Sequence, residues 1–301
     1  PEEWRAHPHG AALAVGPLLT VRRTGAPTPR RLSLASGTAG GTPLLPASGV
    51  RVLDFTRVIA GPVGTRTLAL LGADVLRIDA PQLPELPAQH LDTGLGKRSA
   101  LLDLRSPEGL AALDELLADA DVVVTGYRPG ALAKFGLDPD ALAERRPGIV
   151  TVALSAWGGP GPWSGLRGFD SLVQGPTGIA HIEADGDERP GVLPAQALDH
   201  GTGYLIAAGV LRALTERQRD GRGSHIDVAL ARTAAWLLRH HDPDEHLPAF
   251  PRRVAAGPHL AHATVAQGEL AYARPPFTIK GGPTDWAEPP VPWGSSPAAW
   301  W

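Results

Sequence analysis

Short apolar runs alternate with amphipathic stretches through the middle of the chain. Residues 52–55 and 75–78 are compact apolar runs, and the spacing over residues 63–71 between them is that of a helix. Together they predict a βαβ unit about thirty residues long. Further strands are expected over 121–125, 149–154 and 224–230, and further helices after the N-cap pair Ser106-Pro107 and over 131–135, 140–145, 204–216 and 232–239.

This alternation predicts the fold class. The strand at 149–154 is apolar at almost every position, as expected for a parallel strand buried on both faces. We therefore predict an α/β fold, a Rossmann-like open parallel sheet flanked by helices. Its ligands would bind at the carboxyl ends of the strands.

The pattern divides the chain into three regions, 1–48, 49–240 and 241–301. The first is an N-terminal extension with a helix expected near 4–13 and a strand near 18–22, and the second is the Rossmann-like core. Past His240 the periodicity is lost, and proline and glycine crowd 243–258 and 275–301, which predicts a Pro-rich C-terminal wrap. We expect core or docking roles for the tryptophans at 236, 286, 293, 300 and 301.

Composition narrows the class of protein. The 301 residues are 43% hydrophobic and 20% charged, which is typical of a globular protein, and a net charge of −3 gives no reason to expect nucleic acid as a partner. No apolar run approaches the roughly 18–20 residues of a membrane span, and no secretion signal is visible, so we expect no membrane partner and a cytoplasmic location. The chain opens at Pro1 and has no Met, which suggests a processed or truncated piece of a longer protein.

Metal and nicotinamide sites are not favoured. The absence of Cys removes disulfides, thiolate nucleophiles and thiolate metal ligands. The run from His240 to His246 has the residue types of a metal site, but Pro243 disrupts helical spacing, so a solvated loop is favoured and no metal is expected. Asp79 ends a strand where a dinucleotide domain places its ribose-binding acid, yet the first βα turn lacks G-x-G-x-x-G.

Asp199 is the candidate with the most specific chemistry. It stands before Gly201, Gly203 and an apolar helix, where a carboxylate could act as a covalent nucleophile. The glycines would let backbone N–H groups approach an oxyanion at the start of the helix. The alternative is that Asp199 only N-caps the helix over 204–216. Asp170 is a second acid of this site, with a loop or capping role as its alternative.

Several short motifs follow one another along the chain, and their order indicates a protein family. Over roughly residues 49–238 the chain resembles the family III CoA-transferases, the family of formyl-CoA transferase, carnitine CoA-transferase and α-methylacyl-CoA racemase. The motifs are residues 52–62 and 71–75, Gly96-Lys97-Arg98-Ser99, Leu102-Asp103-Leu104, Pro107-Glu108-Gly109, Tyr127-Arg128-Pro129-Gly130, Gly168-Phe169-Asp170, Asp199-His200-Gly201-Thr202-Gly203 and Gly221-Arg222-Gly223.

The resemblance implies a reaction in which Asp199 attacks an acyl-CoA thioester, and CoA passes to a free carboxylic acid through aspartyl anhydride and thioester intermediates. Coenzyme A is then substrate and acyl carrier, and the acyl-CoA and the acid are the partners. The racemase branch uses a histidine where this chain has Phe169, which cannot carry a proton. A 2-methylacyl-CoA racemase or epimerase and a catalytically silent CoA-binding scaffold remain the alternatives. His200 is expected to be a spectator or a substrate-pocket residue.

The resemblance also implies where CoA binds. Its phosphates and adenine require cations and an apolar slot. We add Arg98 as an expected phosphate contact, placed with Arg105 at the carboxyl ends of the first strands. Ile59 and Ala80 depart from a polar contact and an arginine of the family, so fewer phosphate contacts are expected. The matching positions are Val58, Leu102, Arg105, Tyr127, Ala131, Lys134 and Arg167.

Relatives in this family carry a small second domain and form interlocked homodimers. Here the region after His240 is short, and no glycine-rich loop resembles the family's active-site lid. Residues 2–31 loosely resemble small-domain sequence placed ahead of the core. We therefore expect either a reduced or rearranged small domain or a small domain supplied by a partner chain, and the resemblance implies a homodimer, interlocked as in the family.

Overall fold

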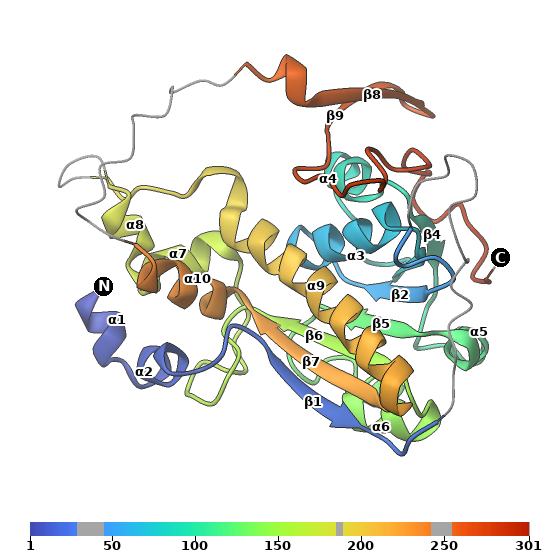
Figure 1. Ribbon diagram of the computed structural model, residues 1–301, viewed down its shortest axis with the longest axis horizontal. Helices are drawn as coiled ribbons and strands as arrows, with labels where there is room; N and C mark the ends of the chain where they lie inside the picture. The colour runs from blue at the N-terminus through green and yellow to red at the C-terminus, as the bar shows by residue number, and fades with distance from the viewer. Residues whose placement is uncertain (29–44, 185–188, 242–254, 301) are drawn as a thin grey trace.

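The computed structural model describes residues 1–28, 45–184, 189–241 and 255–300, and its centre is a seven-stranded sheet of order β1-β7-β6-β5-β2-β3-β4 (Figure 1). All neighbours from β7 to β4 pair in parallel, which confirms the predicted open parallel sheet. These strands are β2 (Arg51–Phe55), β3 (Asp74–Asp79), β4 (Arg98–Leu101), β5 (Val122–Thr125), β6 (Val150–Ser155) and β7 (Gly223–Ala229).

The N-terminal segment contributes directly to this sheet. Strand β1 (Thr20–Thr24) pairs antiparallel with β7, so the sheet has an antiparallel edge that the alternation pattern did not predict. The helix expected near 4–13 is divided into α1 (Glu2–Ala6) and α2 (Pro8–Ala14). The division falls at His7, whose ψ of 135° is extended, because the ring of the following proline disfavours helical backbone there.

Helices cover the two faces of the sheet separately. On one face lie α3 (Ala60–Leu70) and α9 (Ala197–Asp220), side by side in Figure 1, and their apolar residues share a core with alternate valines of the strands. On the other face α5 (Pro107–Asp119) and α6 (Pro139–Arg145) cover the remaining strand residues. As predicted, Ser106 caps α5, since its hydroxyl accepts the N–H of Gly109 at 3.0 Å.

Helix α9 begins much earlier than predicted. It starts at Ala197, so Gly201 and Gly203 lie inside the helix and form no turn before it. A Cβ on Gly203 would stand 2.7 Å from both the Ala60 carbonyl oxygen and the Val63 Cβ. This glycine is therefore required for the close approach of α9 to α3, and the low helix propensity of glycine is overcome by that packing.

Two shorter regions lie beside the ends of the strands. Between β6 and α9 are α7 (Asp170–Thr177), α8 (Ile179–Ile182) and the short 3-10 turn η2 (Pro194–Gln196), and after β7 comes the predicted helix α10 (Leu230–Arg239). Between β3 and β4 is α4 (Pro87–Thr93), and between β5 and α6 is the 3-10 turn η1 (Ala133–Phe135), shorter than the helix expected over 131–135. None of α4, α7 and α8 was predicted.

The C-terminal region contains regular secondary structure in addition to the proline-rich segments that predicted a wrap. After the 3-10 turn η3 (Gly257–His259), strands β8 (Leu260–Val265) and β9 (Gly268–Ala273) form an antiparallel hairpin that packs on Leu95. The docking role predicted for three tryptophans is confirmed. Their indole N–H groups donate to backbone or carboxylate oxygens of the core: Trp286 to Arg66 O at 2.8 Å, Trp293 to Asp79 Oδ2 at 3.0 Å and Trp300 to Leu116 O at 2.9 Å.

Trp236 differs from these three. It is 42% exposed on α10 and its ring lies tilted against that of His240, so it is not a core residue. Trp301 lies outside the described residues. In the described part of the chain no helix combines the length and the apolar character needed to span a bilayer.

Candidate active site

A cavity of about 560 Å³ opens at the carboxyl ends of the parallel strands. Its walls come from the turn after β2, the ends of β5 and β6, the start of α7 and the start of α9. This is the edge at which open α/β sheets bind their ligands. Its lining includes Arg57, Val58, Ile59, Leu83, Tyr127, Arg128, Ser155, Leu166, Arg167, Phe169, Asp199 and Leu230.

Asp199 lies in the first turn of α9 and faces this cavity. Its side chain is only 7% exposed, and within the described part of the chain its carboxylate accepts no hydrogen bond. Burial, and secondarily the nearby carboxylate of Asp170, raise the pKa of Asp199 to about 7. The group can therefore change protonation near neutral pH, which is common among catalytic carboxyls.

Asp170 holds the backbone beneath that carboxyl. It is the first residue of α7, and its Oδ2 accepts the backbone N–H of Asp199 at 2.9 Å. Its Oδ1 accepts the side-chain amide of Gln174, whose own oxygen accepts the N–H of Leu193 at 2.8 Å. Asp170 thus satisfies one of the free N–H groups at the start of α9 from a neighbouring helix.

This arrangement corrects two expectations about the start of the helix. Asp199 is not an N-cap, because the N-cap of α9 is Gln196 and Asp199 is already helical. Gly201 and Gly203 are also helical, and inside an α-helix the N–H donates to the carbonyl four residues earlier, so neither is placed to bind an oxyanion. His200 is partly buried but does not line the cavity, and burial lowers its pKa.

The turn between β2 and α3 forms one wall of the cavity and has unusual backbone geometry. Val58 has a φ of +68°, rare for a β-branched residue, and its N–H donates to Glu85 Oε2 at 3.1 Å. A Cβ on Gly61 would lie 2.3 Å from Thr56, so only glycine allows α3 to start this close to β2. The turn is thus fixed at Val58 by the hydrogen bond to Glu85 and at Gly61 by close packing on Thr56.

A buried ion pair supports this turn, and the sequence reasoning did not single it out. Lys97 Nζ lies 3.0 Å from Asp54 Oδ2, and it donates to the Pro62 carbonyl at 2.9 Å and to Thr65 Oγ1 at 2.6 Å. The two side chains are 1% and 0% exposed. Burial alone would raise the pKa of Asp54, but Lys97 and the hydroxyls of Thr56 and Thr65 hold it below its usual range. In the sequence, Asp54 could have been noticed because it is a charged residue inside the otherwise apolar strand over 52–55.

The positions expected to contact CoA fall into two groups. Val58, Tyr127 and Arg167 line the Asp199 cavity, and Ala131 lines a second cavity that also contains Tyr127. Leu102 is buried beside the end of β3, where its N–H donates to the Asp79 carbonyl at 3.0 Å.

The two outer cations are exposed. Arg105 pairs with Asp103 at 2.8 Å, and the Lys134 ammonium lies 4.9 Å from the centre of the Phe135 ring. Neither lines the Asp199 cavity, so both are placed for the outer part of a long ligand.

Arg98 does not belong to this edge of the sheet. It is the first residue of β4, at the amino ends of the strands, and its guanidinium is held by Asp74 at 2.7 Å and by the Ala299 carbonyl. The expectation that it lies with Arg105 at the carboxyl ends is wrong. Arg98 precedes the expected strand and Arg105 follows it, so the chain direction alone places them at opposite ends of a parallel strand.

Arg57, Arg128 and Ser155 line the cavity although they were not assigned a role. Arg57 pairs with Glu85 at 3.3 Å, whereas no ion pair involves Arg128 within the described residues. The signal that could have found Arg128 is its place in the Tyr127-Arg128-Pro129 motif, just after β5.

Other candidate sites have less support. Asp79 is engaged by Arg77 at 2.7 Å and by the indole of Trp293, so its carboxylate is not directed to a ribose. The part of the chain that the structure describes contains no cluster of three His, Cys, Asp or Glu residues able to hold a metal. The run from His240 to His246 lies mostly outside the described residues.

The chain is similar in sequence to known proteins. Residues 47–257 match the family described as CoA-transferase family III. A probable fatty acyl-CoA transferase of Mycobacterium tuberculosis, Rv3272, is 34% identical over 208 residues, which cover 65% of this chain and 53% of that protein. A succinate–glutarate CoA-transferase of Agrobacterium fabrum is 33% identical over 215 residues, covering 65% and 54%.

Solved structures agree. The crystal structure of Rv3272 superposes with a TM-score of 0.62 at 34% identity over 66% of this chain and 57% of that one. A CAIB/BAIF family protein from Brucella suis has a TM-score of 0.59 at 29% identity, over 76% and 65%. The chain spans about half the length of the curated relatives named above. From the match to residues 47–257, the chain belongs to the CoA-transferase family III.

Proposed function

We propose that this chain transfers CoA between an acyl-CoA and a free carboxylic acid, with Asp199 as the covalent nucleophile. The observation that carries the proposal is the buried carboxyl of Asp199, without a hydrogen-bond partner in the described structure, at the wall of an open cavity. A carboxylate held in this way is less stabilised than one in water, which increases its reactivity toward a thioester. Asp170 is a positioning residue, since it binds only the backbone N–H of Asp199.

The chemical steps balance without a further reactant. A carboxylate oxygen of Asp199 attacks the thioester carbonyl carbon, the C–S bond breaks, and CoA leaves as the thiolate. The thiolate then attacks the aspartyl carbonyl of the mixed anhydride, which releases the donor acid and forms an aspartyl-CoA thioester. The acceptor carboxylate repeats the first step on that thioester, and the thiolate finally attacks the acceptor acyl carbon and restores Asp199.

Transfer is favoured over racemisation by one residue. Phe169 stands where the racemase branch carries a histidine, and its ring is 54% exposed at the wall of the cavity. A phenyl ring cannot accept or return a proton at the α-carbon. A scaffold that binds CoA without catalysing a reaction remains the second candidate. A covalent intermediate on Asp199 distinguishes the two, because a scaffold would not form it.

The test is trapping of that intermediate. Incubation with an acyl-CoA and hydroxylamine should leave a hydroxamate on Asp199, visible as a mass increase of the intact chain and located by peptide mapping. CoA binding without any adduct on Asp199 would overturn the nucleophile assignment and favour the scaffold.

Adduct formation should depend on pH with a definite sign. The nucleophile is the ionised carboxylate, and the pKa of Asp199 is raised to about 7, so the trapping rate should rise through that pH and level off above it. Folding favours the protonated form of this group. Its contribution to stability should therefore be present below the ordinary carboxyl range and be lost as the pH rises through about 7. A trapping rate that is flat between pH 5 and 8 would contradict this account.

We propose further that Arg105 and Lys134 attract the CoA phosphates. Reversing both to Glu should weaken CoA binding at least about tenfold and flatten its salt dependence, because exposed charges act mainly through screened attraction. Calorimetry at two salt concentrations checks this. The matched control reverses Arg212 and Arg219, which are 70% and 65% exposed on α9. Unchanged affinity in the first variant, or an equal loss in the control, would move the phosphate site elsewhere.

The resemblance to the family also motivates a homodimer. Sedimentation of the full chain would test it, with a concentration-independent monomer as the contrary result.

A further inference from the structure

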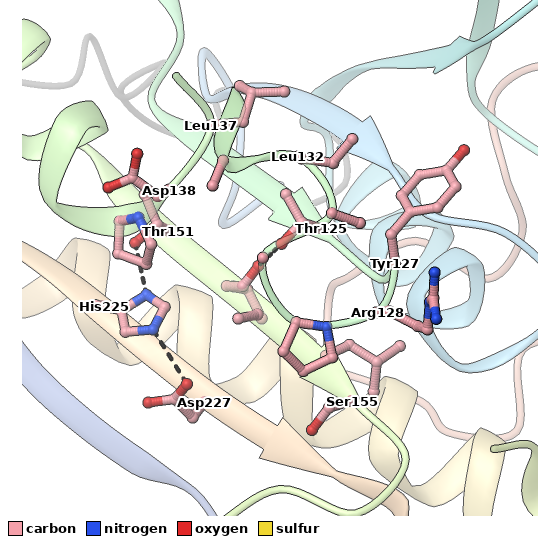
Figure 2. A pocket seen from close by; sticks show the side chains of 18 of the residues that line it. Thr125, Tyr127, Arg128, Leu132, Leu137, Asp138, Thr151, Ser155, His225 and Asp227 are labelled. Atoms are coloured by element: carbon pink, nitrogen blue, oxygen red, sulfur yellow. Dashed lines mark hydrogen bonds and ion pairs between the residues drawn. The ribbon is translucent and has the colours of Figure 1, made fainter. Parts of the chain in front are cut away.

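A second cavity adjoins the first on the face of the sheet that carries α6. It measures about 350 Å³, lies over β5, β6 and β7, and is bounded by the segment from Arg128 to Leu142 and by the loop after β6. Figure 2 shows this cavity, with Leu132 and Leu137 on one side and the residues of the strands below. The aliphatic part of its wall comes from Val123, Ala131, Leu132, Ala133, Leu137, Leu142, Val152, Ala153 and Leu154.

The polar groups of its floor bind one another. His225 Nε2 lies 3.1 Å from Asp227 Oδ1, and Nδ1 lies 2.9 Å from Thr151 Oγ1, which forms the row of dashed contacts in Figure 2. The Thr125 hydroxyl donates to the Val152 carbonyl at 3.1 Å. An apolar guest would therefore leave the His225 ring and the hydroxyls of Thr151 and Thr125 with their partners. The carboxylate of Asp227 is 57% exposed, and it can keep its water at the rim of the cavity.

The two cavities meet along a common wall. Tyr127, Arg128 and Pro129 after β5, and Leu154 and Ser155 at the end of β6, line both of them. The ends of β5 and β6 are therefore the place at which a group attached to Asp199 in the first cavity would enter the second. Its charged lining residues are the carboxylates of Asp138 and Asp227 and the guanidinium of Arg128, which stands on the wall shared by the two cavities.

We propose that the second cavity holds the aliphatic tail of the acyl group, so that the substrates are straight-chain acyl groups of medium length. This inference rests on the proposed function, because it takes the acyl carbonyl to be at Asp199. Each methylene that leaves water for such a wall should tighten binding roughly two- to fourfold until the cavity is full.

The experiment uses the full chain and S-alkyl-CoA thioethers, which bind but cannot transfer. Calorimetry compares free CoA with S-ethyl-, S-butyl-, S-octyl- and S-dodecyl-CoA. Affinity should rise from ethyl to octyl by at least about thirtyfold and then level off. Ala153 lines only the second cavity, and Ala153→Phe should remove the gain with chain length. The matched control is Ala118→Phe, which adds the same ring on the exposed side of α5 and should keep the full gain.

Each other result overturns the inference. Equal affinities along the wild-type series would show that no tail enters a cavity of this kind. A loss of free CoA affinity in Ala153→Phe as large as the loss of S-octyl-CoA affinity would place the nucleotide end of CoA there, next to Ala131. If Ala153→Phe fails to fold, Ala153→Leu replaces it, and a gain with chain length as large as in the wild type would then overturn the inference. The hydroxylamine adduct on Asp199 is a separate readout, so failure of the tail site leaves the proposed transfer intact.

Discussion

Asp199→Ala should abolish CoA transfer, lowering the turnover rate on the order of 10³-fold or more, while CoA affinity stays within about twofold. The carboxylate acts on the thioester carbonyl and makes no contact that the nucleotide needs. Transfer assayed by exchange of labelled acid, together with calorimetry for CoA, measures the two quantities independently. Asp199→Asn, which keeps the shape of the side chain and removes its nucleophilicity, is the matched control and should be equally inactive.

The stability of the same variant distinguishes the nucleophile from a helix cap. Removing an N-cap side chain costs about 1 kcal/mol. The Asp199 carboxylate accepts no hydrogen bond in the described structure and is buried beside Asp170, so its loss should leave the free energy of unfolding unchanged or raise it at neutral pH. Retained turnover in a protein that has become less stable would contradict the assignment.

The layout of the core could be predicted because its signals are local. The strand that became β6 is apolar at most positions, and the segment that became α5 has its own cap and a single apolar face. Strand β1 is different. Its partner β7 lies about two hundred residues later in the chain, as in the pair Thr20 and Asp227, and no local pattern reports such a pairing or its direction.

The start of α9 and the place of Arg98 show where local rules fail. Glycine at 201 and 203 favours a turn by propensity, but at 203 the approach to Ala60 and Val63 on α3 makes glycine the residue that the helix needs. Arg98 is the first residue of β4, so its place at the amino edge follows from the chain direction, whereas its partners Asp74 and the carbonyl of Ala299 are distant in sequence and could not be predicted. The hairpin β8–β9 was missed because half of its strand residues are exposed and only Ala261 and Tyr272 are buried, which leaves no strong alternation to read.

Lys97→Met should be the most destabilising substitution considered, with a loss of about 3–5 kcal/mol in the free energy of unfolding. Methionine fills the same space but leaves the Asp54 carboxylate buried without its ammonium partner, along with the Pro62 carbonyl. Urea unfolding followed by circular dichroism measures the loss. Lys280→Met, an exposed lysine to the same residue, is the control and should change stability by less than about 0.5 kcal/mol.

The double variant Lys97→Met, Asp54→Asn tests whether the penalty belongs to the unpaired charge. Removing both charges should recover much of the stability, because an apolar side chain beside a neutral amide avoids a buried ion. Asp54 has a lowered pKa in the folded chain, so its contribution is present above the ordinary carboxyl range and is lost as the pH falls through the folded pKa. The double variant should lack that acid-dependent loss. A Lys97→Met protein within 1 kcal/mol of the wild type would mean that the turn carrying Val58 and Ile59 into the Asp199 cavity is held by its backbone contacts instead.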